Sequence, residues 1–416
     1  MKTGILVAYF AKRDEAREAF KLLRRKGFRR AALIGKTPDG NVHARGPFPW
    51  MGRSGFGLER RLLEDHTRWL GSGETVLILR TPVERLHSPV AILRESGEIP
   101  PAIFTLHPKR KRLASGTEPL GNPLSAAQIP EYAERLAGEQ RLAPDTRPDI
   151  GLLKRLEKTR RRMHQACTDL AESSRLGQST PPTAEWLLDN EYIVENNIRE
   201  IQTNLPRHYY LDLPSLAGEP CRGLPRIYGL AMDLVSRTDL RLDEENILAF
   251  IDAYQSTSTL SIGELWAVPQ MLRAALIESI ATLAETTLTE LREREIADFW
   301  ANRLITVTRR DPNRLFSILA ELAEMQPTPS TYFASRLIEN LYDQEAALAP
   351  VQGWLERVFR KPLGDLNPRE HTRQMKNQIS IGNAFTSLRQ LALLDWRKIF
   401  EKLSRVERLL RLDPSG

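Results

Sequence analysis

The chain has 416 residues, which is enough for two or three domains and a sizeable hydrophobic core. Its 41% hydrophobic and 27% charged residues are typical of a globular protein, and no apolar run reaches the roughly 18–20 residues of a membrane span. The net charge of +7 is unevenly placed, because residues 1–115 hold 23 Lys and Arg against 11 Asp and Glu. We therefore expect no membrane-spanning helix within residues 1–416.

The first apolar run, GILVAYFA, is eight residues long and is followed at once by Lys12-Arg13-Asp14-Glu15. We therefore expect a first β-strand rather than a signal peptide. The two cysteines, Cys167 and Cys221, form no CxxC pair, which predicts a reduced compartment and a cytoplasmic protein. Because the seven histidines show no HExxH or HxxxH spacing, no zinc site is expected. We also assign no other metal and no cofactor.

Residues 1–108 alternate strand and helix patterns. Strands are expected at residues 5–10, 31–35, 75–80 and 102–106, and helices at 13–26, 58–70 and 83–95. Gly27 stands where a helix C-cap favours glycine, and the Gly- and Pro-rich residues 35–57 predict a long loop or hairpin. This order predicts a small basic α/β or α+β domain, for which the ferredoxin-like arrangement is one candidate.

The charge of this domain suggests an anionic neighbour: membrane lipid, a nucleotide or nucleic acid. The candidate anion-binding residues are Arg24, Arg25, Arg29, Arg30, Lys109 and Arg110. The alternative is a solvated basic face that has no partner.

The remainder of the chain is predicted to be helical. Residues 109–149 read as a linker, residues 150–178 as a charged connecting helix, and residues 179–416 as an all-helical domain. Helices are expected at 183–205, 243–254, 265–283, 290–306, 313–325, 330–348, 350–360, 369–394 and 396–410. Since no repeat of fixed period is visible, a bundle or an irregular α/α stack is favoured over a solenoid. The expected fold class is α+β.

The sequence around Glu264 allows two interpretations. Ser261 and Glu264 match a helix capping box, which alone would account for the carboxylate. In the other reading Glu264 and the nearby Trp266 bind a sugar, whose ring stacks on the indole while its hydroxyls bond to the acid. Pro269 predicts that the helix kinks at this residue or that a new helix begins there.

Three further residues are candidates for substrate binding. Arg226 has the fork geometry to hold a phosphate or carboxylate, or it pairs with Glu185, Asp189 or Asp233 inside the helical core. Tyr228 lies in the same turn-then-helix element. Tyr209, in the loop after Pro206, lines a glycan groove or packs between helices.

Motifs for catalysis are missing. A glycoside hydrolase needs two carboxyl groups that converge from separate elements, and sequence cannot show that convergence. No DxD-type metal motif stands in a suitable context, the segment from Gln390 to Trp396 does not match a QxxRW pattern, and there is no Walker loop, G-x-G-x-x-G or G-x-S-x-G. No catalytic residue is therefore assigned.

Five ordered blocks lie between residues 184 and 267: AEWLLDN, NLPRHYYLDLP, GLPRIYGLA, FIDAYQ and IGELWA. Their arrangement resembles the N-terminal region of bacterial cyclic β-1,2-glucan synthases, large membrane enzymes that build glucan rings from UDP-glucose. The later stretch 366–410 is similar to the segment that precedes the transferase domain of that family. The resemblance covers about residues 180–410 and does not clearly include residues 1–110.

The resemblance implies a cytoplasmic region, peripheral to the inner membrane, that precedes a membrane-embedded transferase and the cyclisation and phosphorylase-like domains. This chain, as a fragment or a truncated or split product, would scaffold or position the transferase. The expected partners are the remaining synthase domains in cis or trans, β-1,2-glucan and an anionic membrane surface, but not nucleic acid.

Two alternatives remain open. One is a standalone interaction protein whose basic domain binds membrane or nucleic acid. The other is a glucan-acting enzyme with a pair of carboxylates, which a capped Glu264 and a buried Trp266 would argue against.

Overall fold

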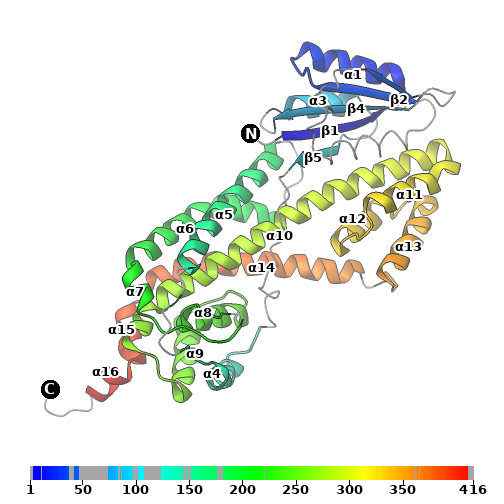
Figure 1. Cartoon of the computed structure of the whole chain (residues 1–416). Helices are drawn as coiled ribbons and strands as arrows, with labels where there is room; N and C mark the ends of the chain where they lie inside the picture. The colour runs from blue at the N-terminus through cyan, green and yellow to red at the C-terminus, as the bar shows by residue number, and fades with distance from the viewer. Residues whose placement is uncertain are drawn as a thin grey trace. The chain divides into compact units, whose positions relative to one another are not determined.

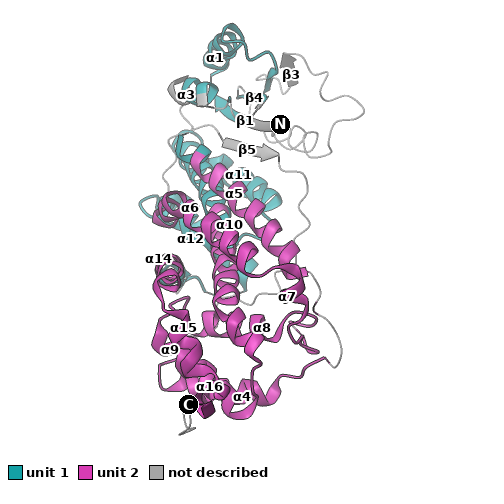
Figure 2. Ribbon diagram, turned by 90° about the vertical axis from the view of Figure 1, so that its left-hand side faces the viewer, with its two compact units in different colours: residues 1–111, 172–179, 289–373 teal, residues 112–171, 180–288, 374–416 magenta. Residues whose placement is uncertain are grey.

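The computed structural model describes residues 3–10, 12–36, 42–45, 74–82, 85, 87–96, 102–106, 123–143, 148, 151–175, 181–219, 221–360, 362–364 and 366–410. The chain divides into two compact units, which Figure 2 colours separately. Unit 1 comprises residues 1–111, 172–179 and 289–373, and unit 2 comprises residues 112–171, 180–288 and 374–416. The predicted boundaries between domain, linker and helical body stay a prediction.

Unit 1 begins with a five-stranded sheet and two helices (Figure 1). The elements in chain order are β1 (Thr3–Phe10), α1 (Arg13–Arg25), β2 (Ala31–Lys36), β3 (Val42–Arg45), β4 (Thr75–Pro82), α3 (His87–Ser96) and β5 (Ala102–Leu106). The strand order is β3-β2-β4-β1-β5, and every neighbouring pair is antiparallel. Without β3 the order β2-β4-β1-β5 is that of a β-α-β-β-α-β ferredoxin-like sheet. The structure thus confirms the ferredoxin-like candidate and adds β3, which forms a hairpin with β2 inside the predicted loop or hairpin.

Both faces of this sheet are covered within unit 1. Leu6, Ala8 and Phe10 point to one face and pack with the buried sides of α1 and α3. Val7 and Tyr9 point to the other face and pack with helices from the later part of the unit. Because a strand buried on both faces needs apolar residues at every position, β1 reads as a continuous run rather than an alternating one.

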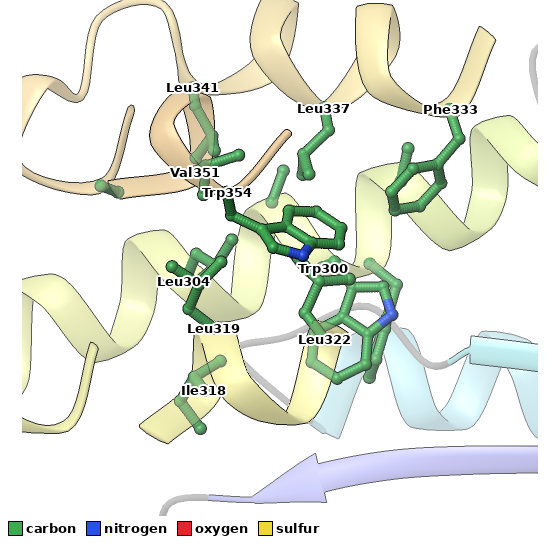
Figure 3. Packing of buried hydrophobic residues seen from close by; sticks show 14 of the residues in the cluster. Trp300, Leu304, Ile318, Leu319, Leu322, Phe333, Leu337, Leu341, Val351 and Trp354 are labelled. Atoms are coloured by element: carbon green, nitrogen blue, oxygen red, sulfur yellow. The ribbon is translucent and has the colours of Figure 1, made fainter. Parts of the chain in front are cut away.

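The helices of unit 1 form their own apolar core, shown in Figure 3. They are the second part of α10 (Ile262–Arg310), the short η3 (Pro312–Arg314), α11 (Leu315–Met325), α12 (Thr331–Leu341), α13 (Glu345–Phe359) and the start of α14 (Leu366–Leu393). Trp300 from α10 and Trp354 from α13 lie in this core with Leu322 and Leu337 (Figure 3). The same cluster includes the β-sheet residues Val7 and Tyr9, so sheet and helices share one core.

Unit 2 is helical. It contains α4 (Gln128–Glu139), α5 (Gly151–Arg175, mostly in this unit), α6 (Pro182–Asn204), α7 (Arg207–Leu211), α8 (Arg226–Arg237), α9 (Glu244–Thr257), the first part of α10, the rest of α14, α15 (Trp396–Leu403) and α16 (Arg405–Leu410). Asp243 caps α9 through a capping box with Asn246, as the sequence predicts for its N-cap. The link from α8 to α9 passes through Asp239 and Leu240 at positive φ, and hydroxyl groups of Ser380 and Ser387 on α14 hold it.

Several expectations differ from the structure. Helix α10 continues through Pro269, so no new helix begins there, and the helix predicted at 290–306 is part of the same α10. The predicted linker 109–149 includes helix α4. The predicted helix 330–348 is divided between α12 and α13. The predicted helix 58–70, and the residues Lys109 and Arg110, lie outside the described residues. Among the helices that the structure describes, none combines the length and apolarity of a membrane span.

Candidate functional site

Unit 2 contains a pocket of about 550 Å³ whose wall joins four helices. It is lined by Glu200 and Asn204 at the end of α6, Tyr209 of α7, Gly263, Trp266, Pro269, Gln270 and Arg273 on the first turns of α10, and Trp396 at the start of α15. Two of these, Tyr209 and Trp266, are candidates from the sequence. The pocket therefore gathers aromatic, amide and charged side chains from segments far apart in the chain.

Trp266 provides an exposed aromatic wall. Its neighbours in the chain, Leu265 and Ala267, are buried, whereas Trp266 is 47% exposed. The ring stacks on Phe400 of α15, with the ring centroids 4.3 Å apart and the planes inclined by 21°. Because this stacking holds the indole in place before a ligand arrives, binding would order few additional side-chain rotations.

The other two aromatic residues of the pocket are anchored by hydrogen bonds. The hydroxyl group of Tyr209 donates to the carbonyl oxygen of Gly263 at 2.5 Å, and burial raises the pKa of Tyr209 to about 12. The indole nitrogen of Trp396 donates to the carbonyl oxygen of Leu391 at 2.8 Å. The hydrogen-bond donors of both side chains are thus already engaged within the protein.

Arg273 and Glu200 supply an ion pair at the pocket. Arg273 is 5% exposed, and its Nη2 lies 3.0 Å from Oε2 of Glu200, whose side chain is 50% exposed. The Nε of Arg273 donates to Oδ1 of Asn197 at 3.0 Å. Burial lowers the pKa of Arg273, and the charge of Glu200 opposes that shift. A buried cation is therefore balanced by a carboxylate that also faces solvent.

Glu264 and Arg226 pair with each other away from solvent. Arg226 Nε donates to Glu264 Oε1 at 2.7 Å, Arg226 Nη2 donates to Oε2 at 2.5 Å, and the two residues are 4% and 0% exposed. Ser261 completes the capping box, because its backbone N–H donates to Glu264 and its hydroxyl oxygen accepts from the Glu264 N–H. Glu264 is thus part of a helix cap and Arg226 is part of a buried ion pair, as in the structural alternatives predicted for these residues. The partner of Arg226, however, is none of the three carboxylates expected from the sequence.

Tyr228 is also buried. It is 1% exposed, its hydroxyl group donates to Oε2 of Glu278 at 2.8 Å, and the guanidinium of Arg155 lies over its ring. Burial raises the pKa of Tyr228 well above its usual value. The carboxylate of Asp233 accepts from Tyr132 instead of pairing with Arg226. Of the five candidate substrate-binding residues, Trp266 and Tyr209 therefore line the pocket, and Glu264, Arg226 and Tyr228 lie in the core.

Most of the polar residues in the pocket wall were not predicted from the sequence, although helical spacing could have revealed them. Trp266, Gln270 and Arg273 follow each other at steps of four and three residues, which place them on one face of a helix. Glu200 and Asn204 have the same four-residue step on α6. Only the structure brings these two faces and Trp396 together.

Few groups that could act in catalysis lie among the described residues around the pocket. Glu200 is the one carboxylate among its described lining residues, whereas a glycoside hydrolase needs two. The described part of the chain contains no group of three or more His, Cys, Asp or Glu that could hold a metal ion. The two thiols are poor nucleophiles, because burial raises the pKa of Cys167 to about 12 and that of Cys221 to about 11.

The candidate anion-binding residues Arg24, Arg25, Arg29 and Arg30 lie in unit 1 at the C-terminal end of α1 and just beyond it. All four are exposed.

No protein-family model matches the chain. It is 32% identical over 238 residues to the cyclic beta-(1,2)-glucan synthase NdvB of Rhizobium meliloti (strain 1021). The match takes in 56% of this chain and 8% of that protein, so the chain spans a small part of the length of its relative. The resemblance to part of a cyclic β-1,2-glucan synthase is therefore confirmed.

Proposed function

We propose that the chain is an accessory part of a glucan-synthesising glycosyltransferase system and that the pocket of unit 2 binds β-1,2-glucan. The observation that carries this proposal is the meeting of Trp266, Trp396 and the Glu200–Arg273 pair in one pocket. The similarity to part of a cyclic β-1,2-glucan synthase supports glucan as the ligand.

The chemistry of the pocket suits a neutral sugar chain. The apolar faces of pyranose rings stack on aromatic side chains, and the hydroxyl groups need both donors and acceptors around them. Asn204 and Gln270 offer both, and Glu200 offers acceptors. The volume of about 550 Å³ lies within the range of roughly 300–1,000 Å³ that small-molecule sites occupy.

In this role the chain guides glucan and positions a transferase without carrying out the transfer itself. Its partners would be the remaining synthase domains, on the same chain or on another. Its place of work would be the cytoplasmic side of the inner membrane, beside that transferase.

Calorimetric titration of the full chain with linear and cyclic β-1,2-glucans tests the proposal, with sugar release followed in the same samples. We expect binding without release. Trp266→Ala and Trp396→Ala should weaken binding at least about tenfold, because each removes a stacking surface. Glu200→Gln should weaken binding by about tenfold or more, since a charged acceptor is lost.

Two controls match these variants. Trp186→Ala removes an indole that is 38% exposed and lies in unit 2 outside the residues that line the pocket. Glu191→Gln removes a carboxylate from the same helix as Glu200. Both should bind glucan as the wild type does. A wild-type chain that binds neither glucan would overturn the proposal, and so would equal losses in the pocket variants and the controls.

A further inference from the structure

The C-terminal end of α1 collects exposed cations around a tight turn. The N–H of Gly27 donates to the carbonyl oxygen of Arg24, and the N–H of Phe28 donates to that of Leu23, which together form a Schellman motif with Gly27 at φ +87°. Leu23 and Phe28 are buried in the same core. These two buried side chains fix the turn against the core, and the cations before and after the turn are exposed to solvent.

A cation from another segment joins this turn. The guanidinium of Arg85, which precedes α3, lies 5.4 Å from the ring centroid of Phe28. We call the exposed residues Arg24, Arg25, Lys26, Arg29, Arg30 and Arg85 the cationic patch. Because Arg85 contacts the ring of Phe28, the cationic patch combines residues from two separate segments of the chain, 24–30 and 85.

The charges of α1 are segregated along the helix. Its three carboxylates, Asp14, Glu15 and Glu18, each pair with a cation, namely Arg17, Lys12 and Lys21. None of the ion pairs formed by the described residues includes a member of the cationic patch. One or two basic residues would suffice to balance the negative end of the helix dipole. The patch therefore holds more positive charge than the helix requires.

The features beside the patch favour a lipid surface over nucleic acid. Single-stranded nucleic acid binds to exposed aromatic platforms, yet Phe20 and Phe28 are buried. The sheet face that could offer such a platform is covered by helices of the same unit. Leu22, which is 39% exposed, adds an apolar side chain next to the cations. Clusters of four to eight Lys and Arg are typical of segments that bind anionic lipid.

We infer that the cationic patch docks the chain on the surface of a bilayer that contains anionic lipids. This inference is independent of the glucan pocket, because the patch lies in unit 1 and the pocket lies in unit 2. The attraction would come from several guanidinium groups facing lipid phosphates at once.

Sedimentation with vesicles tests this inference on the full chain. The vesicles are phosphatidylcholine alone, or phosphatidylcholine with about one third phosphatidylglycerol, in about 0.15 M salt, where charges act over about 8 Å. We expect binding to the anionic vesicles only. The triple variant Arg24→Gln/Arg25→Gln/Arg29→Gln should reduce the partition coefficient roughly 100-fold, since each cation near an anionic surface contributes about fivefold.

The matched control is Lys12→Gln/Arg13→Gln/Arg17→Gln, which removes the same charge from the other end of α1. It should retain binding to within a few-fold of the wild type. Equal losses in the two triple variants would overturn the inference, because they would indicate an effect of net charge alone. Binding of the wild type to double-stranded DNA but not to anionic vesicles, with the DNA binding lost in the patch variant, would also overturn it.

Discussion

The ion pair of Arg226 and Glu264 illustrates how a single buried residue can resemble a binding residue in the sequence. Its geometry is that of a bidentate ligand clamp, yet Arg226 also donates to Ser258 and Thr259, and Glu264 closes a helix cap. The pair joins the start of α8 to the start of α10. Its role is therefore to hold the segment that carries Trp266.

At the residue scale, we predict that Arg226→Met destabilises unit 2 by about 3–5 kcal/mol, because it leaves the carboxylate of Glu264 buried without its counter-charge. The double variant Arg226→Met/Glu264→Met should cost less than the sum of the two single changes. Urea unfolding of the four proteins measures this coupling.

A suitable control is Arg199→Met, which breaks a pair with Glu195 in which the arginine is 69% exposed. It should change the free energy of unfolding by less than about 1 kcal/mol. If the costs of Arg226→Met and Glu264→Met were simply additive, the two side chains would not depend on each other.

Among the elements, the predicted strands and helices agree with the structure where the sequence pattern is local. The strand at residues 5–10 and the helix at 13–26 are both confirmed, because an apolar run and a helical stripe are visible without any partner. The alternative that a new helix begins at Pro269 is wrong for a non-local reason. Pro269 and its neighbours Val268 and Gln270 are all buried, so packing outweighs the cost of a proline inside α10.

At the element scale, we predict that Gly27→Ala lowers the stability of unit 1 by about 1 kcal/mol. A Cβ at this position would meet no atom within 4 Å, so the cost is that of a positive φ alone. Gly353→Ala, inside α13 of the same unit and equally free of contacts, should instead raise stability by about 0.5–1 kcal/mol. Thermal unfolding that shifted in the same direction for both variants would contradict this account.

For the whole molecule, the sequence predicts the fold class and two of the nine described residues that line the pocket, Tyr209 and Trp266. The ferredoxin-like order follows from the sequence of strands and helices, whereas the cover of helices over its second face depends on contacts between residues about 290 positions apart, such as Tyr9 with Phe299. Trp266 is a candidate from the sequence and Arg273 follows it on the same face of α10, but Trp396 joins them only through the packing of α15. Contacts between residues far apart in the chain therefore determine most of the features that the sequence alone does not predict.

A partly buried carboxylate, Glu293, makes the stability of unit 1 depend on pH. Burial raises the pKa of Glu293 above its usual value of 4.5, although the hydrogen bond from Ser330 and the charge of Arg373 lower it, and Glu370 adds to the rise. The folded state thus holds this proton more tightly than the unfolded state. Stability from this group is highest below pH 4.5 and decreases as the pH rises through the raised pKa.

At the scale of the whole molecule, we therefore predict that Glu293→Gln gains stability relative to the wild type as the pH rises from about 4 to about 7. Glu18→Gln should show the opposite trend, because the hydrogen bond from Lys21 lowers the pKa of Glu18. Urea unfolding at several pH values measures both trends. A stability difference for Glu293→Gln that did not vary with pH would rule out a raised pKa at this residue.

The burial of Cys167 and the partial burial of Cys221 also have a practical consequence for chemical labelling. With pKa values of about 12 for Cys167 and about 11 for Cys221, only a very small fraction of either is thiolate at neutral pH. A maleimide dye would react far faster with a cysteine introduced at an open position such as Tyr192, which is 60% exposed. The unmodified chain is thus a suitable background for attaching one fluorescent probe at a chosen residue, with no native cysteine replaced.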